Sequence, residues 1–426
     1  MNLGNQKMYI VMVGLPAMGK STIAARIRES LLAEDTPAEI FNNGDLRRRM
    51  IAENTSAAGF YAPDNPHGVE LREKIAWTNI EYARTFLQKE GRVAILDATN
   101  VSRQRRQLIQ EMLADHPILF IECVNNDQEI LDSSIARKAS LPEFHHLSFA
   151  EARKSFSQRI DYYRKIQAPF SDERNHILVD SLNNSILDVS LSDTLPYFDQ
   201  IRDIILTSTV SNLYLVRHGQ THDNLVNRIG GDARLTEEGI RQAKAMAECF
   251  QSISAPYIFC GPKIRTIQTA QIIRKRQRLD CGVIPLTEFG EIYAGVCESM
   301  TYKEIKDSKP EIYQARLQDK YNYIYPGGEG YVSMKERINR GIKKALFLSA
   351  RAEHIIIVGH QAANRMILSH FLYRREQDVP YTYVPQNRFY HIVSTQIKKL
   401  IELKAPSEEK RKAETIKEAA AAAEKN

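Results

Sequence analysis

The sequence predicts an α/β protein made of two domains. Its 426 residues exceed the length of a typical single domain, so we expect two, each large enough to bury a core. In both halves short apolar runs alternate with amphipathic stretches, which is the pattern of βαβ units whose parallel sheet is covered by helices. A glycine-rich loop also follows the first apolar run, as in P-loop NTPase-like domains.

Five strands are predicted in the N-terminal half. They are residues 8–13, 39–42, 93–96, 119–124 and 177–179, with amphipathic helices at 21–32 and 72–88 between them. Residues 180–211 are rich in Asn, Ser and Asp and become helical around 198–206, so we interpret them as the connection between the domains. Residues 1–205 are therefore assigned to a P-loop domain with a parallel sheet.

The second α/β pattern begins at residue 212. Strands are predicted at 212–216, 257–260 and 354–358, a strand-like run at 286–289, and helices at 236–253, 266–276 and 362–371. Thr236 is the expected N-cap of the first of these helices. Residues 211–403 form the second predicted domain. The tail at 404–426 is rich in Ala, Glu and Lys and is expected to be disordered or a solvated single helix.

Charge and cysteine usage restrict the class of function. Lys and Arg total 58 against 52 for Asp and Glu, a net charge of +6. This suits small anionic ligands and is weaker than the charge of a dedicated nucleic-acid binder. No signal peptide is expected, and no apolar run approaches the ~18 residues of a membrane span. The five scattered cysteines, an odd number without a CxxC pair, predict reduced thiols in the cytoplasm.

The first motif is a phosphate-binding loop. Residues 14–21 read G-x-x-x-x-G-K-S between a predicted strand and a predicted helix. Glycines let backbone N–H groups face phosphate oxygens, and the helix N-terminus adds positive potential. Lys20 is expected to reach the β- and γ-phosphates of ATP, and the Ser21 hydroxyl to bind Mg²⁺.

An aspartate and two groups of arginines extend this site. Asp97 follows a predicted strand, at the edge of the sheet where such domains bind ligands. It either holds Mg²⁺ indirectly or accepts the proton of an acceptor hydroxyl, although an aspartate that merely starts a helix is the simpler alternative. The arginines lie at 47–49 and at 103, 105 and 106. Arg binds phosphate with two hydrogen bonds, so we prefer acceptor binding to a solvated basic face.

The second motif centres on His218 in the string Arg217-His218-Gly219 after a predicted strand. A histidine that attacks phosphorus must be neutral, while the phosphate needs cations around it. The candidates for that charge are Arg217, Arg265 and His360. Arg217 and His360 lie at the ends of predicted strands, and Arg265 lies at the start of a predicted helix. Glu291 is the candidate general acid, whose pKa burial or neighbouring anions would have to raise.

These motifs resemble the bifunctional 6-phosphofructo-2-kinase/fructose-2,6-bisphosphatase family. The resemblance covers about residues 8–390 and includes the strings Phe41-Asn42-Asn43-Gly44, Asp97-Ala98-Thr99-Asn100, Arg228-Ile229-Gly230-Gly231-Asp232 and Gln318-Asp319-Lys320-Tyr321. It implies that the N-terminal half makes fructose 2,6-bisphosphate from ATP and fructose 6-phosphate. It also implies that the C-terminal half has a phosphoglycerate-mutase-like histidine phosphatase fold and hydrolyses this product.

The resemblance implies specific roles in the kinase half. The ATP-binding residues would be Gly14, Leu15, Pro16, Ala17, Met18, Gly19, Lys20, Ser21 and Thr22. Lys138 would lie where the nucleotide meets the sugar phosphate, and Asp97 would be catalytic. Fructose 6-phosphate would contact Arg47, Arg72, Thr99, Arg105, Arg159 and Tyr163.

In the phosphatase half the resemblance implies that His218 becomes phosphohistidine and that Glu291 donates the proton. Arg217, Asn224, Arg265 and His360 would surround the transferred phosphate. The rest of the bisphosphate would lie against Gly230, Tyr302, Arg316, Lys320, Tyr331, Gln361 and Arg365. The resemblance implies no metal in this half, no nucleic acid or membrane as a partner, and a homodimer as the family's habit.

Two other functions fit some of these residues. A polynucleotide 5′-kinase fused to a phosphatase would also use a P-loop and arginines, but the modest net charge and the lack of an aromatic-rich groove signature count against it. A non-catalytic sugar-phosphate sensor would keep the pockets and lose the chemistry. The presence of Lys20, Asp97, His218 and Glu291 counts against such a sensor.

Overall fold

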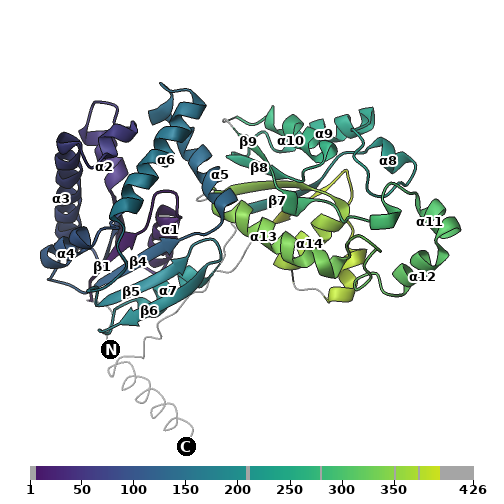
Figure 1. Ribbon diagram of the computed structural model, residues 1–426. Coiled ribbons are helices and arrows are strands. Elements are labelled where there is room, and N and C mark those ends of the chain that lie inside the picture. Colours follow the sequence, from purple (N-terminus) through teal and green to yellow (C-terminus); the bar gives the residue numbers. More distant parts are fainter. Residues whose placement is uncertain (1–5, 208–211, 279–280, 350–351, 373–374, 394–426) are drawn as a thin grey trace, which may run out of the picture. The chain divides into compact units, whose positions relative to one another are not determined.

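A computed structural model describes residues 6–207, 212–278, 281–349, 352–372 and 375–393 (Figure 1). Two sheets account for its strands, one in the N-terminal half and one in the C-terminal half, and helices flank each of them. This is the α/β organisation that the sequence predicts. The tail at 404–426 lies outside the described residues.

The N-terminal sheet has six strands in the order β2-β3-β1-β4-β5-β6. The strands are β1 (Met8–Val13), β2 (Ala38–Asn42), β3 (Val93–Asp97), β4 (Ile118–Val124), β5 (Asn175–Asp180) and β6 (Ser185–Leu191). All pairs are parallel except the last, in which β6 runs antiparallel to β5. Every residue of β1 is buried, as expected for the central strand of a sheet covered on both faces.

Seven α-helices and two short 3₁₀ turns are described in this half. They are α1 (Lys20–Ala33), α2 (Asn43–Met50), α3 (Pro66–Gln88), α4 (Arg103–Met112), α5 (Gln128–Ala139), α6 (Phe149–Ile166) and α7 (Phe198–Leu206), with η2 (Ala58–Tyr61) and η3 (Pro142–Phe144). Polar side chains begin several of them by accepting a backbone N–H. Asn42 caps α2, Ser102 caps α4 and Ser148 forms a capping box on α6.

The C-terminal sheet has five strands in the order β11-β7-β10-β8-β9. They are β7 (Asn212–Arg217), β8 (Tyr257–Cys260), β9 (Gly282–Pro285), β10 (His354–Gly359) and β11 (Phe389–Ile392). Only β11 is antiparallel to its neighbour. The register pairs Gly359 of β10 with Arg217 of β7, so the residues that follow these two strands leave the sheet side by side.

The helices of this half are α8 (His222–Leu225), α9 (Glu237–Cys249), α10 (Ile264–Arg274), α11 (Tyr302–Ser308), α12 (Pro310–Gln318), α13 (Tyr331–Ser349) and α14 (Gln361–Phe371). Three 3₁₀ turns accompany them, η4 (Thr287–Phe289), η5 (Gly295–Cys297) and η6 (Glu376–Tyr381). Thr236 caps α9 as predicted, and its hydroxyl accepts the N–H of Gly239. The helix ends at Cys249, before the predicted residue 253.

Three sequence-based expectations about the fold are wrong in detail. Residues 180–211 are not a simple connection, because they contain strand β6, which belongs to the N-terminal sheet. Residues 286–289 form the turn η4 rather than a strand. Strands β9 and β11 were not predicted. They are four residues long, like the correctly predicted β8, but most of their residues are not buried, so the apolar run that reveals β8 is missing.

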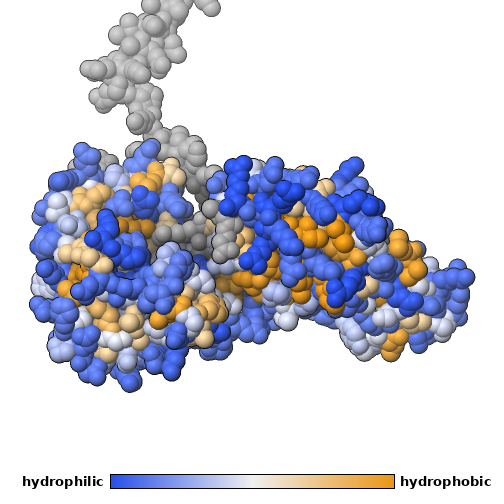
Figure 2. All heavy atoms as spheres, turned by 90° about the horizontal axis from the view of Figure 1, so that it is seen from above, coloured by the Kyte–Doolittle hydropathy of each residue, from blue (hydrophilic) through white to orange (hydrophobic). Residues whose placement is uncertain are grey.

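The surface combines polar and apolar areas. Hydrophilic residues cover most of the face drawn in Figure 2, with hydrophobic patches between them. Within the described residues, no helix combines the length and apolar composition that a bilayer crossing requires. One row of apolar side chains on the surface belongs to β6, where Leu187, Val189 and Leu191 are exposed.

Candidate active sites

The phosphate-binding loop connects β1 to α1, in the place that the motif predicts. Gly14 has a φ of +134°, and a Cβ there would lie 2.5 Å from the carbonyl oxygen of Cys123. Gly19, the N-cap of α1, has a φ of +82°. Both positions therefore require glycine. The Lys20 ammonium donates to the carbonyl oxygens of Gly14 and Leu15 at 2.8 and 2.7 Å, so the lysine lies across its own loop.

Burial and neighbouring charges tune Lys20 and its environment. Burial lowers the pKa of the Lys20 ammonium from its ordinary 10.5 to about 8, although the Asp97 carboxylate opposes this shift. Asp97 is the last residue of β3 and is itself buried, and it accepts a hydrogen bond from the Asn42 amide at 2.5 Å. Because α4 begins only at Arg103, Asp97 does not start a helix. The simpler alternative for this residue is therefore wrong.

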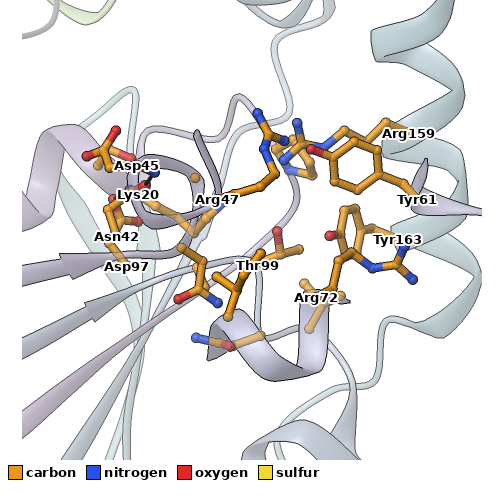
Figure 3. A pocket seen from close by; sticks show the side chains of 18 of the residues that line it. Lys20, Asn42, Asp45, Arg47, Tyr61, Arg72, Asp97, Thr99, Arg159 and Tyr163 are labelled. Carbon is orange, nitrogen blue, oxygen red and sulfur yellow. Dashed lines mark hydrogen bonds between the residues drawn. The ribbon is translucent and has the colours of Figure 1, made fainter. Parts of the chain in front are cut away.

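One pocket of about 1030 Å³ brings the loop and the predicted acceptor residues together. Its lining includes Pro16, Ala17, Met18, Gly19, Lys20, Ser21 and Thr22, and also Arg47, Arg72, Asp97, Thr99, Arg105, Lys138, Arg159 and Tyr163. Figure 3 shows Lys20 and Asp97 at one side of this pocket and Arg72, Arg159 and Tyr163 at the other, with Thr99 between them. Strand ends and the six helices α1 to α6 thus supply one site.

The pocket holds more buried cations than carboxylates to pair with them. Arg47 pairs with Glu143 and Arg105 pairs with Glu73. Among the described residues, Arg72, Lys138 and Arg159 form no ion pair with a carboxylate within 4.0 Å. Burial lowers the pKa of all three, because a cation without solvent or counter-ion is disfavoured. An anion bound here would relieve that cost.

Only some of the arginines predicted to bind the acceptor line the pocket. Arg47, Arg48 and Arg105 line the pocket, as predicted for acceptor binding. Arg106 does not, because its guanidinium is fully buried and paired with Glu173. Arg103 pairs with Asp172. Acceptor binding was thus a wrong prediction for Arg49, Arg103 and Arg106, since none of the three is among the described residues that line the pocket. Arg106 instead packs α4 against Glu173.

Two oxygen donors of the pocket fit Mg²⁺. Ser21 and Asp97 line it together, and the described residues contain no group of three His, Cys, Asp or Glu side chains that could hold a metal. Magnesium in nucleotide sites typically takes one or two protein oxygens and completes its shell with water and phosphate oxygens. Ser21 and Asp97 therefore suit a magnesium ion that arrives with a nucleotide.

The second site forms where β7 and β10 end side by side. His218 follows β7 and His360 follows β10, and the centroids of their rings lie 5.4 Å apart. The Nε–H of Arg265, at the start of α10, lies 3.2 Å from Nε2 of His218 and 3.2 Å from Nδ1 of His360. The Arg265 Nη1 also donates to the carbonyl oxygen of Gly231 at 2.9 Å, which fixes the guanidinium between the two rings.

This arrangement assigns the tautomer of His218. Since the Arg265 Nε can only donate, Nε2 of His218 carries a lone pair. Its Nδ1–H then donates to the carbonyl oxygen of Gly219 at 2.8 Å. Burial, Arg265 and Arg217 hold the pKa of His218 well below 6.5. The imidazole is therefore neutral at physiological pH, with its nucleophilic nitrogen facing the cation.

Two buried donors of this site lack partners. The Nε of Arg217 and the Nε2 of His360 have no hydrogen-bond partner among the described residues. Arg217 is held by its Nη1, which donates to the carbonyl oxygen of Val384 at 2.9 Å. Buried polar groups normally find a partner, so unpaired donors beside His218 favour an anionic ligand.

Glu291 occupies the N-terminus of α14. Its carboxylate accepts the backbone N–H groups of Gln361, Ala362 and Ala363 at 3.0 to 3.3 Å. These contacts bring it next to His360, the residue before α14. The N-terminus of α14 thus anchors the Glu291 carboxyl group beside His360, within the second site.

Two arginines predicted to bind the rest of the bisphosphate donate hydrogen bonds to predicted tyrosines. Arg316 donates to the Tyr302 hydroxyl at 3.3 Å, and Arg365 donates to the Tyr331 hydroxyl at 3.0 Å. Lys320 donates to the carbonyl oxygen of Pro380, and burial, with Arg316 and Arg365 nearby, lowers its pKa to about 8. Gly230 has a φ of +70°. Asn224 is the third residue of the capping box of α8, and its side-chain oxygen accepts the N–H of the N-cap Thr221.

Some pocket residues carry no sequence signal. Tyr61 and Glu143 line the first pocket from the turns η2 and η3, and neither belongs to a recognisable motif. In the second site, the carbonyl oxygens of Pro380, Thr382 and Val384 receive hydrogen bonds from Lys320, Arg365 and Arg217. Backbone carbonyls exist at every residue, so no residue type could reveal these contacts.

Comparisons with known proteins match both halves. The family model for 6-phosphofructo-2-kinase matches residues 1–207, and the model for branch 1 of the histidine phosphatase superfamily matches residues 213–404. The 6-phosphofructo-2-kinase/fructose-2,6-bisphosphatase 1 of Bos taurus is 32% identical over 400 residues, which cover 89% of this chain and 80% of that protein. The corresponding protein 3 of Homo sapiens is 32% identical over 90% of this chain and 74% of its own length.

Proposed function

Because this chain belongs to the 6-phosphofructo-2-kinase/fructose-2,6-bisphosphatase family, we propose a division of labour between its two sites. The first site transfers the γ-phosphoryl group of ATP to the 2-hydroxyl of fructose 6-phosphate. The second removes this phosphate again through a phosphohistidine. The kinase domain spans residues 1–205 and the phosphatase domain residues 211–403. The observation that carries the proposal is the pocket that joins Lys20 to three cations without a carboxylate partner.

In the kinase site, the proposed roles follow from position. Residues 14–22 hold the phosphates of ATP, and Lys20 leaves its own loop carbonyls to neutralise charge on the transferred group. Asp97 accepts the proton of the 2-hydroxyl as that oxygen attacks phosphorus. The 6-phosphate of fructose 6-phosphate pairs with Arg72 and Arg159, the two buried arginines that have no carboxylate partner among the described residues. Ser21 and Asp97 would hold Mg²⁺, which would supply positive charge to offset that of the ATP phosphates.

In the phosphatase site, Nε2 of His218 attacks the 2-phosphate. A phosphorus–nitrogen bond forms and the bond from phosphorus to the sugar oxygen breaks. Arg217, Arg265 and His360 stabilise the charge on the phosphoryl oxygens. Glu291 gives its proton to the leaving sugar oxygen and later takes one from the water that hydrolyses the phosphohistidine. The proton that Glu291 donates is thus replaced by one from water, and the residue ends the cycle as it began it.

The test is to measure both reactions on one purified sample. ATP and fructose 6-phosphate should yield fructose 2,6-bisphosphate, and the bisphosphate alone should yield fructose 6-phosphate and phosphate without added metal. The family comparisons favour this function over a polynucleotide kinase and over a silent sensor. Phosphorylation of an oligonucleotide 5′ end in preference to fructose 6-phosphate, or no turnover in either direction, would contradict it.

The lowered pKa of Lys20 leads to a pH dependence of the kinase. The ammonium form must be present to bind phosphate, and in the free protein it is lost as the pH rises through about 8. We therefore expect kcat/KM for ATP, which reports the free enzyme, to fall above about pH 8. Bound phosphates favour the charged amine, so kcat at saturating ATP should stay level to higher pH. A kcat/KM that stays level up to pH 10 would contradict this.

We propose that the protein forms a homodimer, as expected for its family, and that two copies pair along β6. This strand is the last of its sheet, and Leu187, Val189 and Leu191 leave 54%, 49% and 40% of their side chains exposed at every second position. An exposed apolar edge strand readily pairs with another strand, and a two-fold axis would pair β6 antiparallel with its copy.

A charge on this edge is expected to separate the copies. We predict that Val189→Lys sediments as a monomer at a concentration where the wild type is a dimer. Leu32→Lys, on the exposed side of α1, is the control that adds the same charge elsewhere. A wild-type chain that sediments as a monomer at micromolar concentration, or a Val189→Lys variant that remains dimeric, would rule this interface out.

The cysteines support a cytoplasmic location, which we also propose. Cys123, Cys249, Cys260 and Cys297 are free thiols. Burial raises the pKa of Cys123 and Cys260 to about 12, so these thiols are unreactive. Free thiols persist in reducing compartments, where ATP and sugar phosphates are also available.

A further inference from the structure

Tyr61 holds three arginines of the kinase pocket in place with its ring. It is the last residue of η2, and only 5% of its side chain is exposed. The guanidinium carbon of Arg159 lies 3.9 Å from the ring centroid, and those of Arg47 and Arg72 lie 5.8 and 5.9 Å from it. These arginines come from α6, α2 and α3, so one aromatic ring gathers cations from three elements.

The hydroxyl of the same residue is buried and has no hydrogen-bond partner among the described residues. Burying a hydroxyl without a partner is unfavourable, and phenylalanine would offer the arginines the same ring without this cost. Tyr61 lines the pocket, and Figure 3 shows its hydroxyl pointing into the space on the side from which Arg47 enters. The hydroxyl therefore lacks a partner at the place where the acceptor is expected.

We propose that Tyr61 is a specificity-determining residue of the kinase, whose hydroxyl donates a hydrogen bond to a phosphate oxygen of fructose 6-phosphate. The inference rests on the proposed kinase function and adds a residue to it. Phosphate is favoured over a sugar hydroxyl because the three arginines place positive charge around the same ring. A phosphate oxygen can accept from the phenol while the guanidinium groups bind its neighbours.

The purely structural alternative assigns Tyr61 only the packing of the arginines. The two roles separate cleanly, because the ring performs one and the oxygen atom performs the other. Tyr61→Phe removes the oxygen and keeps the ring, whereas Tyr61→Leu removes both. Tyr82→Phe is a matched control, since Tyr82 lies on α3 with 52% of its side chain exposed and does not line the pocket.

The experiment measures kcat and KM for both kinase substrates, and the phosphatase rate, on each purified variant. Tyr61→Phe is expected to raise KM for fructose 6-phosphate about tenfold, which corresponds to about 1.4 kcal/mol of lost binding. KM for ATP and the phosphatase rate should change less than twofold, and Tyr82→Phe should match the wild type. Tyr61→Leu should be more impaired than Tyr61→Phe, because the arginines also lose their support.

The outcomes distinguish the inference from the function on which it rests. A wild-type protein without activity on fructose 6-phosphate would defeat the proposed function. An active wild type whose Tyr61→Phe variant keeps the same KM for fructose 6-phosphate would defeat the inference alone. An equal rise in KM for ATP and fructose 6-phosphate would also defeat it, since that pattern indicates general damage to the pocket. The melting temperature of Tyr61→Phe, with and without fructose 6-phosphate, adds a readout: the sugar phosphate should stabilise the variant less than the wild type.

Discussion

His218→Ala is expected to lower fructose-2,6-bisphosphate hydrolysis at least about a thousandfold and to leave the kinase rate within about twofold of wild type. The imidazole supplies the atom that bonds to phosphorus, and alanine offers no substitute. The described residues that line the kinase pocket all belong to the N-terminal half, between Pro16 and Ile166.

Both rates on one sample, together with a labelling experiment, check this prediction. Wild type mixed briefly with bisphosphate labelled at the 2-phosphate should retain acid-labile phosphate on the protein, and His218→Ala should retain none. His370→Ala is the matched control, since His370 lies at the exposed end of α14 and pairs with Asn339. Acid-labile label on His218→Ala at the wild-type level would show that another residue is the nucleophile. Loss of both kinase and phosphatase activity in His218→Ala would contradict the assignment of the two reactions to separate sites.

Lys20→Met is expected to have the opposite effect, lowering kinase kcat/KM by about two to three orders of magnitude while hydrolysis continues. Methionine fills a similar volume but supplies neither charge nor a donor for the transferred phosphoryl group. At neutral pH the folded protein holds the Lys20 cation against the cost of its burial, which lowers its pKa to about 8. Removing the cation also removes that cost, so a collapse of the fold is not expected.

Kinase and phosphatase rates and the melting temperature of Lys20→Met test this second prediction. Lys154→Met, an exposed position on α6, controls for the loss of a positive charge. Phosphatase activity in the Lys20→Met sample reports that the chain has folded. A variant that keeps more than about a tenth of the kinase kcat/KM would mean that other cations of the pocket hold the transferred group.

The features that sequence reasoning predicted well are local ones. The loop at 14–21 forms where an apolar strand meets a helix, and both its glycines adopt a positive φ. Thr236 caps α9 because an N-cap needs only a hydroxyl and the N–H three residues on. Asp97, His218 and His360 all lie at strand ends, and the carboxyl ends of neighbouring parallel strands meet at one edge of a sheet.

The features that sequence reasoning missed depend on partners far along the chain. Arg105 and Arg106 are adjacent, yet one lines the kinase pocket while the other is buried against Glu173, 67 residues further on. Most residues of strand β6 are exposed, so its sequence lacks the apolar pattern of a buried strand and resembles a connection. Tyr61 belongs to no motif, and its importance lies in three arginines that only the fold gathers.

The sequence by itself determined the two α/β halves, the loop that holds Lys20 and the nucleophile His218, because strand patterns, glycine conformations and short motifs act over a few residues. Only the tertiary structure decided which cations lack counter-ions, which nitrogen of His218 carries the lone pair and where Glu291 rests. These properties arise from distance and burial. Both depend on how strands β7 and β10, or helices α2, α3 and α6, are brought together, and not on the order of residues within any one of them.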